Sequence, residues 1–198
     1  SIGRSNVPAN GNSAGAEISG DGEWVAFDSY ATNLVSRDQH NHRDVFSRRL
    51  TTSNTYLESV SSRGDRGNGD SFEPTVSDGG FVAFSSNATN FANNDTNGVS
   101  DVFMRSNSTY LSSTAIGHGP VGGSAPAISA DGSELVFASA SADLAPGDSN
   151  NAADLFMVSR RGPGCFDIGT GLFECDITVA GALDPRTVQW FVDGVHMP

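Results

Sequence analysis

The sequence predicts an all-β protein built from repeated four-stranded antiparallel units, and three observations support this fold class. Turn-forming residues are abundant, with 23 glycines among 198 residues, whereas hydrophobic residues make up only 37%. Apolar residues come in short bursts such as Trp24-Val25-Ala26-Phe27, which favour strands over long helices. The dipeptide Asp-Gly recurs at positions 21, 78 and 131, at spacings of 57 and 53 residues, and such periodic self-similarity is typical of repeat folds.

Each repeat contains the same series of predicted strands. The three copies open at residues 13–27, 71–84 and 124–137. In each copy Asp-Gly lies between two short apolar runs, which is a strong signal for a hairpin. A third strand is predicted to begin at Asp44, Asp101 or Asp154, and a fourth at residues 55–60 of the first copy and 109–114 of the second. Four antiparallel strands per repeat predict the blades of a β-propeller.

The repeats resemble the WD40-like repeats of bacterial TolB-type β-propellers. A blade of that family starts with Pro-x-x-Ser-x-Asp-Gly and an apolar run that ends in Ala-Phe, and residues 74–84 and 126–137 are similar to this start. The first copy has Gly15 or Ala16 where the proline is expected. The resemblance covers about residues 1–160. It implies the propeller fold, and it implies a role as a binding platform or as an accessory domain of an enzyme.

The chain is expected to divide into a propeller part and a C-terminal part. The propeller part is residues 1–161, with repeats that begin at 13, 71 and 124, and the C-terminal β segment is residues 162–198. Residues 1–13 parallel residues 60–71, so we expect them to form the last strand of an incomplete blade. Strands predicted at 173–179 and 188–192 resemble strands B and C of an immunoglobulin-like sandwich. The C-terminal segment is therefore expected to be immunoglobulin-like or to complete a blade.

Charge and hydropathy exclude some classes of partner. The formal net charge is −12, and all 11 basic residues are arginines. Because a negative surface repels phosphate backbones, we expect no nucleic-acid partner. No apolar run reaches the length of a transmembrane helix, so no membrane insertion is expected. We expect an extracellular or cell-surface protein, with the periplasm as the alternative.

Cys165 and Cys175 are the only cysteines, and they flank a predicted hairpin. If Gly169-Thr170-Gly171 forms its loop, counting outward places Cys165 opposite Cys175. Antiparallel strands bring such a pair of Cα atoms within disulfide range. The pattern therefore predicts a disulfide, with two free buried thiols as the alternative, and a disulfide indicates an oxidising compartment.

Acidic segments precede the third strand of each repeat. Oxygen-bearing side chains recur there at positions one, three and seven, and in the second and third copies they are Asp95, Asn97, Asp101, Asp148, Asn150 and Asp154. Such ligands suit Ca²⁺, although the spacing is not that of an EF-hand. The alternative is a local turn, with the last Asp bonding backbone amides at the strand start. In the first copy, Asp38 to Asp44, His40 and His42 also permit a transition metal.

Other motifs lead to modification or are explained by the repeat. Sequons at Asn87, Asn94 and Asn107 permit N-linked glycosylation. The pattern Gly-x-Ser-x-Gly around Ser13 is that of a nucleophile elbow, but an elbow needs a following helix, and the repeat itself accounts for Ser13. The glycine-rich residues 117–122 lack a helix that would bind a dinucleotide. We therefore expect no enzymatic activity.

These observations lead to an expected function as a non-enzymatic extracellular structural or interaction module, in a surface assembly or fibre. The expected partners are other copies of the chain or other surface proteins, because unpaired strand edges recruit strands. One alternative is a propeller that binds glycans or peptides, for which Tyr30 and His118 are loop candidates. The other is an accessory domain of a larger secreted hydrolase.

Overall fold

The computed structural model describes residues 7–36, 38, 40–61, 63–92, 95–106, 122–141, 144, 152–167, 173–183, 190–192 and 195–197. Its elements are β-strands: β1 (Ser13–Ile18), β2 (Trp24–Ser29), β3 (Asp44–Arg49), β4 (Asn54–Leu57), β5 (Ser71–Val76), β6 (Phe81–Ser86), β7 (Asp101–Ser106), β8 (Ser124–Ile128), β9 (Glu134–Ser139), β10 (Asp154–Asp167), β11 (Phe173–Leu183), β12 (Trp190–Val192) and β13 (Val195–Met197). Within these ranges no helix is long and apolar enough to cross a membrane.

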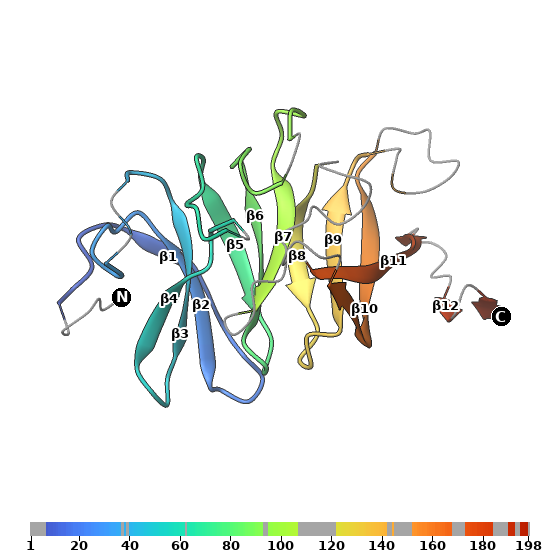
Figure 1. Cartoon of the computed structure of the whole chain (residues 1–198), viewed down its shortest axis with the longest axis horizontal. Helices are drawn as coiled ribbons and strands as arrows, with labels where there is room; N and C mark the ends of the chain where they lie inside the picture. Colours follow the sequence, from blue (N-terminus) through green and yellow to red (C-terminus); the bar gives the residue numbers. More distant parts are fainter. Residues whose placement is uncertain are drawn as a thin grey trace.

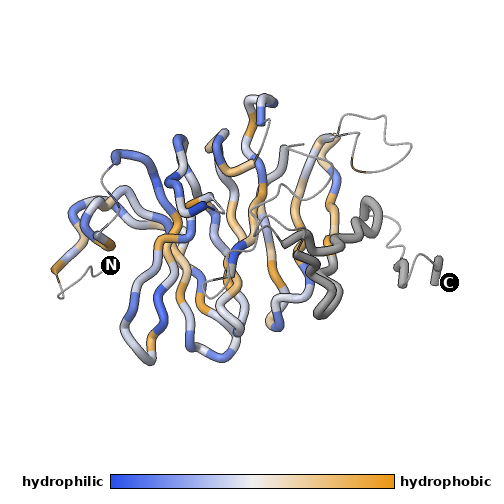
Figure 2. Tube along the Cα trace, viewed as in Figure 1, coloured by the Kyte–Doolittle hydropathy of each residue, from blue (hydrophilic) through white to orange (hydrophobic). Residues whose placement is uncertain are grey.

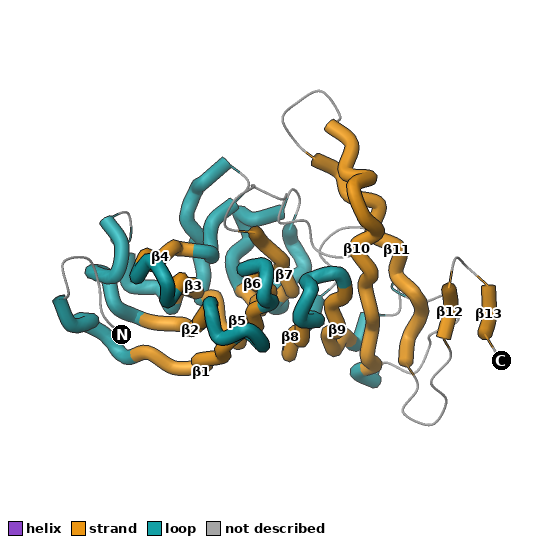
Figure 3. The backbone as a smooth tube through the Cα atoms, turned by 90° about the horizontal axis from the view of Figure 1, so that it is seen from below, coloured by secondary structure: helices purple, strands orange, loops and turns teal. Residues whose placement is uncertain are grey.

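Three antiparallel sheets follow one another along the long axis of the molecule (Figures 1 and 3). Blade 1 has the strand order β1-β2-β3-β4, blade 2 the order β5-β6-β7, and blade 3 the order β8-β9-β10-β11. Strands β12 and β13 pair separately. Each blade thus pairs strands in chain order, as a propeller blade does, and the predicted fold class of all-β, blade-type sheets is confirmed.

The outer strand of blade 1 is shorter than the sequence predicts. It ends at Leu57, whereas the prediction extended it over residues 55–60. Glu58 N and Ser59 N both donate to the same acceptor, Val45 O, at 2.8 and 3.4 Å. The regular pairing of β4 with β3 therefore ends before these residues. The fourth strand predicted for blade 2, residues 109–114, lies outside the described residues.

The C-terminal part is continuous with blade 3. Strand β10 runs through the boundary that the sequence suggested at residues 161 and 162. Strand β11 pairs with β10 and takes the fourth position of the sheet. In this register Cys165 and Cys175 are Cα partners, as the hairpin count predicts.

The Asp-Gly dipeptides lie in the turns between the first two strands of each blade, as predicted. In blade 1, Asp21 Oδ1 accepts hydrogen bonds from Ser19 Oγ and Glu23 N, at 2.6 and 2.8 Å. In blade 3, Asp131 Oδ1 accepts one from Ser129 Oγ at 2.6 Å. Because a short carboxylate side chain can bond its own turn, aspartate suits this position.

The turn of blade 2 is one residue shorter, so its aspartate bonds the turns of the neighbouring blades instead of its own turn. Ser77 N bonds Phe81 O, four residues further on, and Asp78 therefore precedes the position that Asp21 has in blade 1. Asp78 Oδ1 accepts a hydrogen bond from Asp21 N at 2.9 Å. Asp78 N donates to Ala130 O at 2.7 Å. One aspartate thus ties the turns of all three blades together.

The first strand of each blade carries a residue with positive φ at the point where the register shifts. These residues are Gly15, Glu73 and Ala125, with φ of 57°, 54° and 51°. In blade 1 glycine is required, because a Cβ atom on Gly15 would lie 2.4 Å from Asp28 Oδ1. Glu73 accepts hydrogen bonds from Ala125 N and Ser85 Oγ, which offset part of its backbone strain.

Blades 1 and 2 pack through complementary faces. Blade 2 presents Phe84 and Phe103, and blade 1 presents the smaller Ala26 and Val45. All four side chains are buried, and the two rings lie 6.0 Å apart. We call these surfaces the phenylalanine face and the small-residue face of a blade.

Blade 3 packs on blade 2 in the same manner. Its phenylalanine face, Phe137 and Phe156, contacts the small-residue face of blade 2, Ala83 and Val102. The two rings lie 5.9 Å apart, close to the spacing at the first junction. Hydrophobic residues lie along the strands, and the loops at the two ends of the blades are more hydrophilic (Figure 2). The core of the molecule is therefore a series of equivalent junctions between blades.

Candidate metal centre

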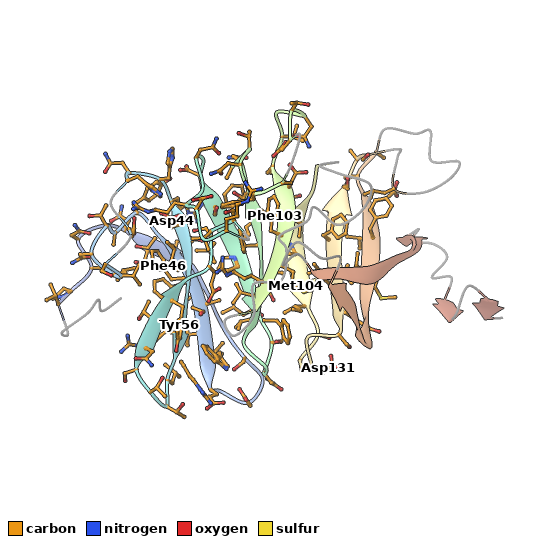
Figure 4. All side chains as sticks on the ribbon, viewed as in Figure 1. Asp44, Phe46, Tyr56, Phe103, Met104 and Asp131 are labelled. Atoms are coloured by element: carbon orange, nitrogen blue, oxygen red, sulfur yellow. The ribbon has the colours of Figure 1, made fainter. Side chains whose placement is uncertain are left out.

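The acidic segments of the first two repeats lie in the loops that lead into β3 and β7, at one end of the blades. We call this the loop end. In Figure 4 Asp44, the first residue of β3, lies at the upper end of blade 1, and Asp131, in the turn between β8 and β9, lies at the opposite end. The repeat thus brings its acidic segments to one side of the molecule and its Asp-Gly turns to the other.

In the first repeat, Asp38, His40 and Asp44 form a cluster. One ligand atom of each side chain lies within 4.8 Å of the other two. Asp38 is 2% exposed and Asp44 0%, and His40 is partly buried. His40 Nδ1 lies 3.5 Å from Asp44 Oδ2, which is longer than an ordinary hydrogen bond.

Several polar atoms of this cluster are buried without a hydrogen-bond partner. They are Asp38 Oδ1, Asp44 Oδ2 and both ring nitrogens of His40. The other carboxylate oxygen of Asp44 accepts a hydrogen bond of 2.6 Å from Ser59 Oγ. Buried polar atoms in folded proteins are nearly always bonded, so these atoms call for a further partner.

The burial of the cluster changes how its groups ionise. Desolvation raises the pKa of Asp38 to about 6, against the opposing charge of Arg66. Desolvation also raises the pKa of Asp44 to about 7, and the negative charge of Asp38 adds to this. For His40, desolvation lowers the pKa, as does the charge of Arg66. A cation between the two carboxylates would offset the cost of ionising them here.

The second repeat has different contacts at the equivalent positions. Asn97 Nδ2 donates to both carboxylate oxygens of Asp101, at 3.2 and 3.3 Å, and Gly122 N donates to Oδ1 at 2.9 Å. Asn97 Oδ1 accepts a hydrogen bond from Val99 N, which closes a local turn. These are the bonds of the turn-forming alternative, although Asp95 Oδ1 is buried without a hydrogen-bond partner.

The remaining candidate ligands do not join the cluster or lie outside the described residues. His42 is partly buried, its ring lies 5.4 Å from that of His40, and its Nδ1 lies 3.4 Å from Asp70 Oδ1. Asp154 begins β10 and is half-buried. Asp148 and Asn150 lie outside the described residues, so the calcium site of the third repeat stays a prediction.

The sequence Ala-Thr-Asn follows the second strand of blades 1 and 2, at residues 31–33 and 88–90, and takes part in a set of hydrogen bonds that we call the lock. Asn68 Nδ2 donates to Thr89 Oγ1 at 2.9 Å, and Thr89 N donates to Asn68 Oδ1 at 2.8 Å. Asn90 Nδ2 donates to Arg66 O at 2.7 Å. Blade 1 has the same set of bonds from Asn10, Thr32, Asn33 and Pro8. In blades 1 and 2 the lock joins the segment before the blade to the loop after its second strand.

The lock also accounts for one of the three sequons. Thr89 of the Asn87 sequon serves the lock, and Asn87 itself is exposed and accessible. Asn94 and Asn107 lie outside the described residues. Glycosylation at all three positions stays a prediction.

The other singled-out residues have structural contacts. Ser13 begins β1 and donates to Ser29 Oγ at 2.9 Å, and the residues that follow it are a strand rather than the helix of a nucleophile elbow. Tyr30 is exposed at the loop end, where its hydroxyl donates to Asp70 Oδ2 at 3.4 Å. His118 lies outside the described residues.

We compared the chain with known proteins and found similar chains among solved structures. No protein-family model and no curated protein matches the sequence. Thirteen chains of solved structures are similar, and one is the crystal structure of TolB from Acinetobacter baumannii. The two chains are 16% identical with a TM-score of 0.43, and the similarity covers 85% of this chain and 32% of that one. This chain thus spans about a third of the length of that TolB chain. By the strand order of its sheets, the described part of the chain is built from the blades of a β-propeller.

Proposed function

We propose that the chain is a non-enzymatic interaction module that works outside the cell and associates with further copies of itself through its end blades. The contact would place the outer side of blade 1 of one copy on the open face of blade 3 of the next. The observation that carries the proposal is the exposure of Leu155, which has in blade 3 the position that Val45 has in blade 1 and Val102 in blade 2.

The three equivalent side chains differ sharply in exposure. Leu155 is 45% exposed, whereas Val45 is 0% and Val102 is 3% exposed. In blades 1 and 2 the phenylalanine face of the following blade covers this position. An apolar side chain that is covered in two repeats and open in the third is suited to receive a further blade.

The other end of the described blades carries the complementary surface. Phe27 and Phe46 stack at 5.7 Å in the phenylalanine face of blade 1, with Val25 and Leu57 half-buried beside them. The two rings are already buried, at 7% and 0% exposure, beneath neighbouring segments of blade 1. A second copy that places this side of blade 1 on Leu155 would therefore bury Leu155 against the half-buried Val25 and Leu57. Because the two surfaces differ, the contact repeats from copy to copy.

Sedimentation of the full chain over a range of concentrations tests the association. We expect the wild type to associate as concentration rises, and Leu155→Asp to remain monomeric because it places a charge in the contact. Leu50→Asp is a matched control, since Leu50 is 44% exposed and follows β3 at the end of the strand opposite to Asp44. Leu50→Asp should associate like the wild type.

Two results would overturn the proposal. A wild type that stays monomeric up to its solubility limit would show that no second copy docks there. Association of Leu155→Asp equal to that of the wild type would show that the copies meet through another surface. Location outside the cell rests on the predicted disulfide and is tested with it.

A further inference from the structure

The geometry points to a binding site for one divalent transition-metal ion of the zinc class, with Asp38, His40 and Asp44 as its ligands. This inference is independent of the proposed association, because the cluster lies at the loop end and Leu155 lies on a blade face. It separates the first repeat from the second, where Asn97 donates hydrogen bonds to the aspartate at the start of β7.

The first argument is the set of buried atoms that lack partners. Asp38 and Asp44 are almost fully buried, and each has one carboxylate oxygen without a hydrogen-bond partner. Both ring nitrogens of His40 also lack a hydrogen-bond partner. Arg66 acts on the cluster through its charge, but no ion pair within 4.0 Å joins Arg66 to these side chains. Two buried carboxylates without a close cation are costly, and a bound dication would neutralise them.

The second argument is the contrast with the second repeat. There the amide of Asn97 donates to Asp101 and satisfies the carboxylate at the start of β7. In the first repeat His40 has the position of Asn97, and its contact with Asp44 is 3.5 Å long. Replacing the amide by an imidazole removes the two donors and supplies a nitrogen that can bind a metal.

The ligand types select the metal. Ca²⁺ prefers sites made of oxygen ligands, whereas imidazole nitrogen suits zinc, copper, nickel and iron. Two aspartates and one histidine balance the charge of a dication. Three protein ligands also leave a position for water, as zinc sites with three ligands do. For the first repeat, we therefore replace the calcium hypothesis with a site for a metal ion that binds nitrogen ligands.

The site would brace the loop end of blade 1. Asp44 is held at the start of β3 by Ser59, which follows β4, while Asp38 and His40 belong to the loop before β3. A metal bound by all three would fix that loop to the two outer strands. Binding of a metal to the folded state alone would also stabilise the fold.

Titration of the metal-free full chain with ZnCl₂ tests the inference, followed by calorimetry and by measurement of bound zinc after gel filtration. We expect one zinc ion to bind at this site, with a higher affinity than Ca²⁺ added as CaCl₂. His40→Asn gives the first repeat the residue of the second, and it should weaken zinc binding by more than the roughly 10–100-fold that loss of an outer-shell partner costs. Asp38→Asn should have a similar effect. CoCl₂ provides a second readout, because its visible spectrum should change with His40→Asn.

Two matched controls make the outcome specific. His42→Asn makes the same change two residues away, at a histidine whose ring contacts that of His40 but whose Nδ1 lies against Asp70, and should weaken zinc binding far less than His40→Asn. Asp95→Asn makes a change in the second repeat and should leave zinc binding unchanged. Circular dichroism checks that each variant is folded. The inference would be overturned by a wild type without saturable zinc binding, by His40→Asn binding zinc like the wild type, or by an equal loss in His42→Asn.

Discussion

Arg105 of blade 2 and Glu58 of blade 1 form an ion pair across the junction between the two blades. Arg105 Nε lies 3.4 Å from Glu58 Oε2, and the carboxylate is almost fully buried. Arg105 also donates to Val60 O at 2.9 Å, and Ser47 Oγ donates to Glu58 Oε1. The pair places a charged contact beside the apolar junction, at the end of β4.

The first prediction concerns pH and Glu58. Burial raises the pKa of Glu58, against the hydrogen bond from Ser47 and the charge of Arg105. A carboxyl whose pKa is raised by folding stabilises the fold most at pH values below its unfolded pKa, and this contribution is lost as pH rises through the folded pKa. In Glu58→Gln the contribution no longer depends on pH. The unfolding free energy of the variant, minus that of the wild type, should therefore increase with pH in urea titrations. A difference that is constant with pH would contradict this.

The second prediction compares equivalent positions in two blades. Val102→Ala opens a cavity at the junction of blades 2 and 3 and should lower the unfolding free energy by about 2 kcal/mol. Leu155→Ala removes more atoms but should cost less than about 1 kcal/mol in dilute solution, because this side chain is half exposed. Chemical denaturation measures both. A larger loss for Leu155→Ala would show that its face is covered within the single chain.

The third prediction concerns the lock before blade 2. Asn68→Ala removes the paired bonds with Thr89 and should lower the unfolding free energy by about 1 kcal/mol, a modest value because the lock is exposed. Asn87→Ala is the control, since Asn87 is exposed and lies in the same loop. It should change the unfolding free energy by less than about 0.5 kcal/mol. Equal effects of the two variants would argue against the lock.

The fourth prediction is the disulfide between Cys165 and Cys175. Their backbone register brings the two residues opposite each other in β10 and β11. Peptide mapping without reduction should find both cysteines in one linked fragment of the native protein. Labelling of both thiols in the native protein would refute the disulfide and remove the support for an extracellular location.

The periodic sequence predicts the first three strands of each blade, because a blade is built from local signals. The Asp-Gly turns and the Asp-aliphatic-Phe starts of β3, β7 and β10 are all read from neighbouring residues. The shorter turn at Asp78 was missed, because the dipeptide is the same although its register differs by one residue.

Contacts between distant residues could not be predicted in this way. Glu58 and Arg105 are 47 residues apart, and no local pattern marks either as a partner of the other. The sequence predicts the acidic loops, but it does not predict that the hydrogen bonds differ between the first and the second repeat. Asn97 satisfies its aspartate and His40 does not, and this depends on hydrogen-bond geometry rather than on residue spacing.

Blade 2 is covered on both faces, by blade 1 through Phe84 and by blade 3 through Ala83. Opening it requires that two neighbours separate, whereas each end blade has one such neighbour among the described strands. The amide protons of β6 should therefore exchange with solvent more slowly than those of β2 and β9. Local unfolding would then proceed from the two ends towards the middle, and the central strand would report the global stability of the chain.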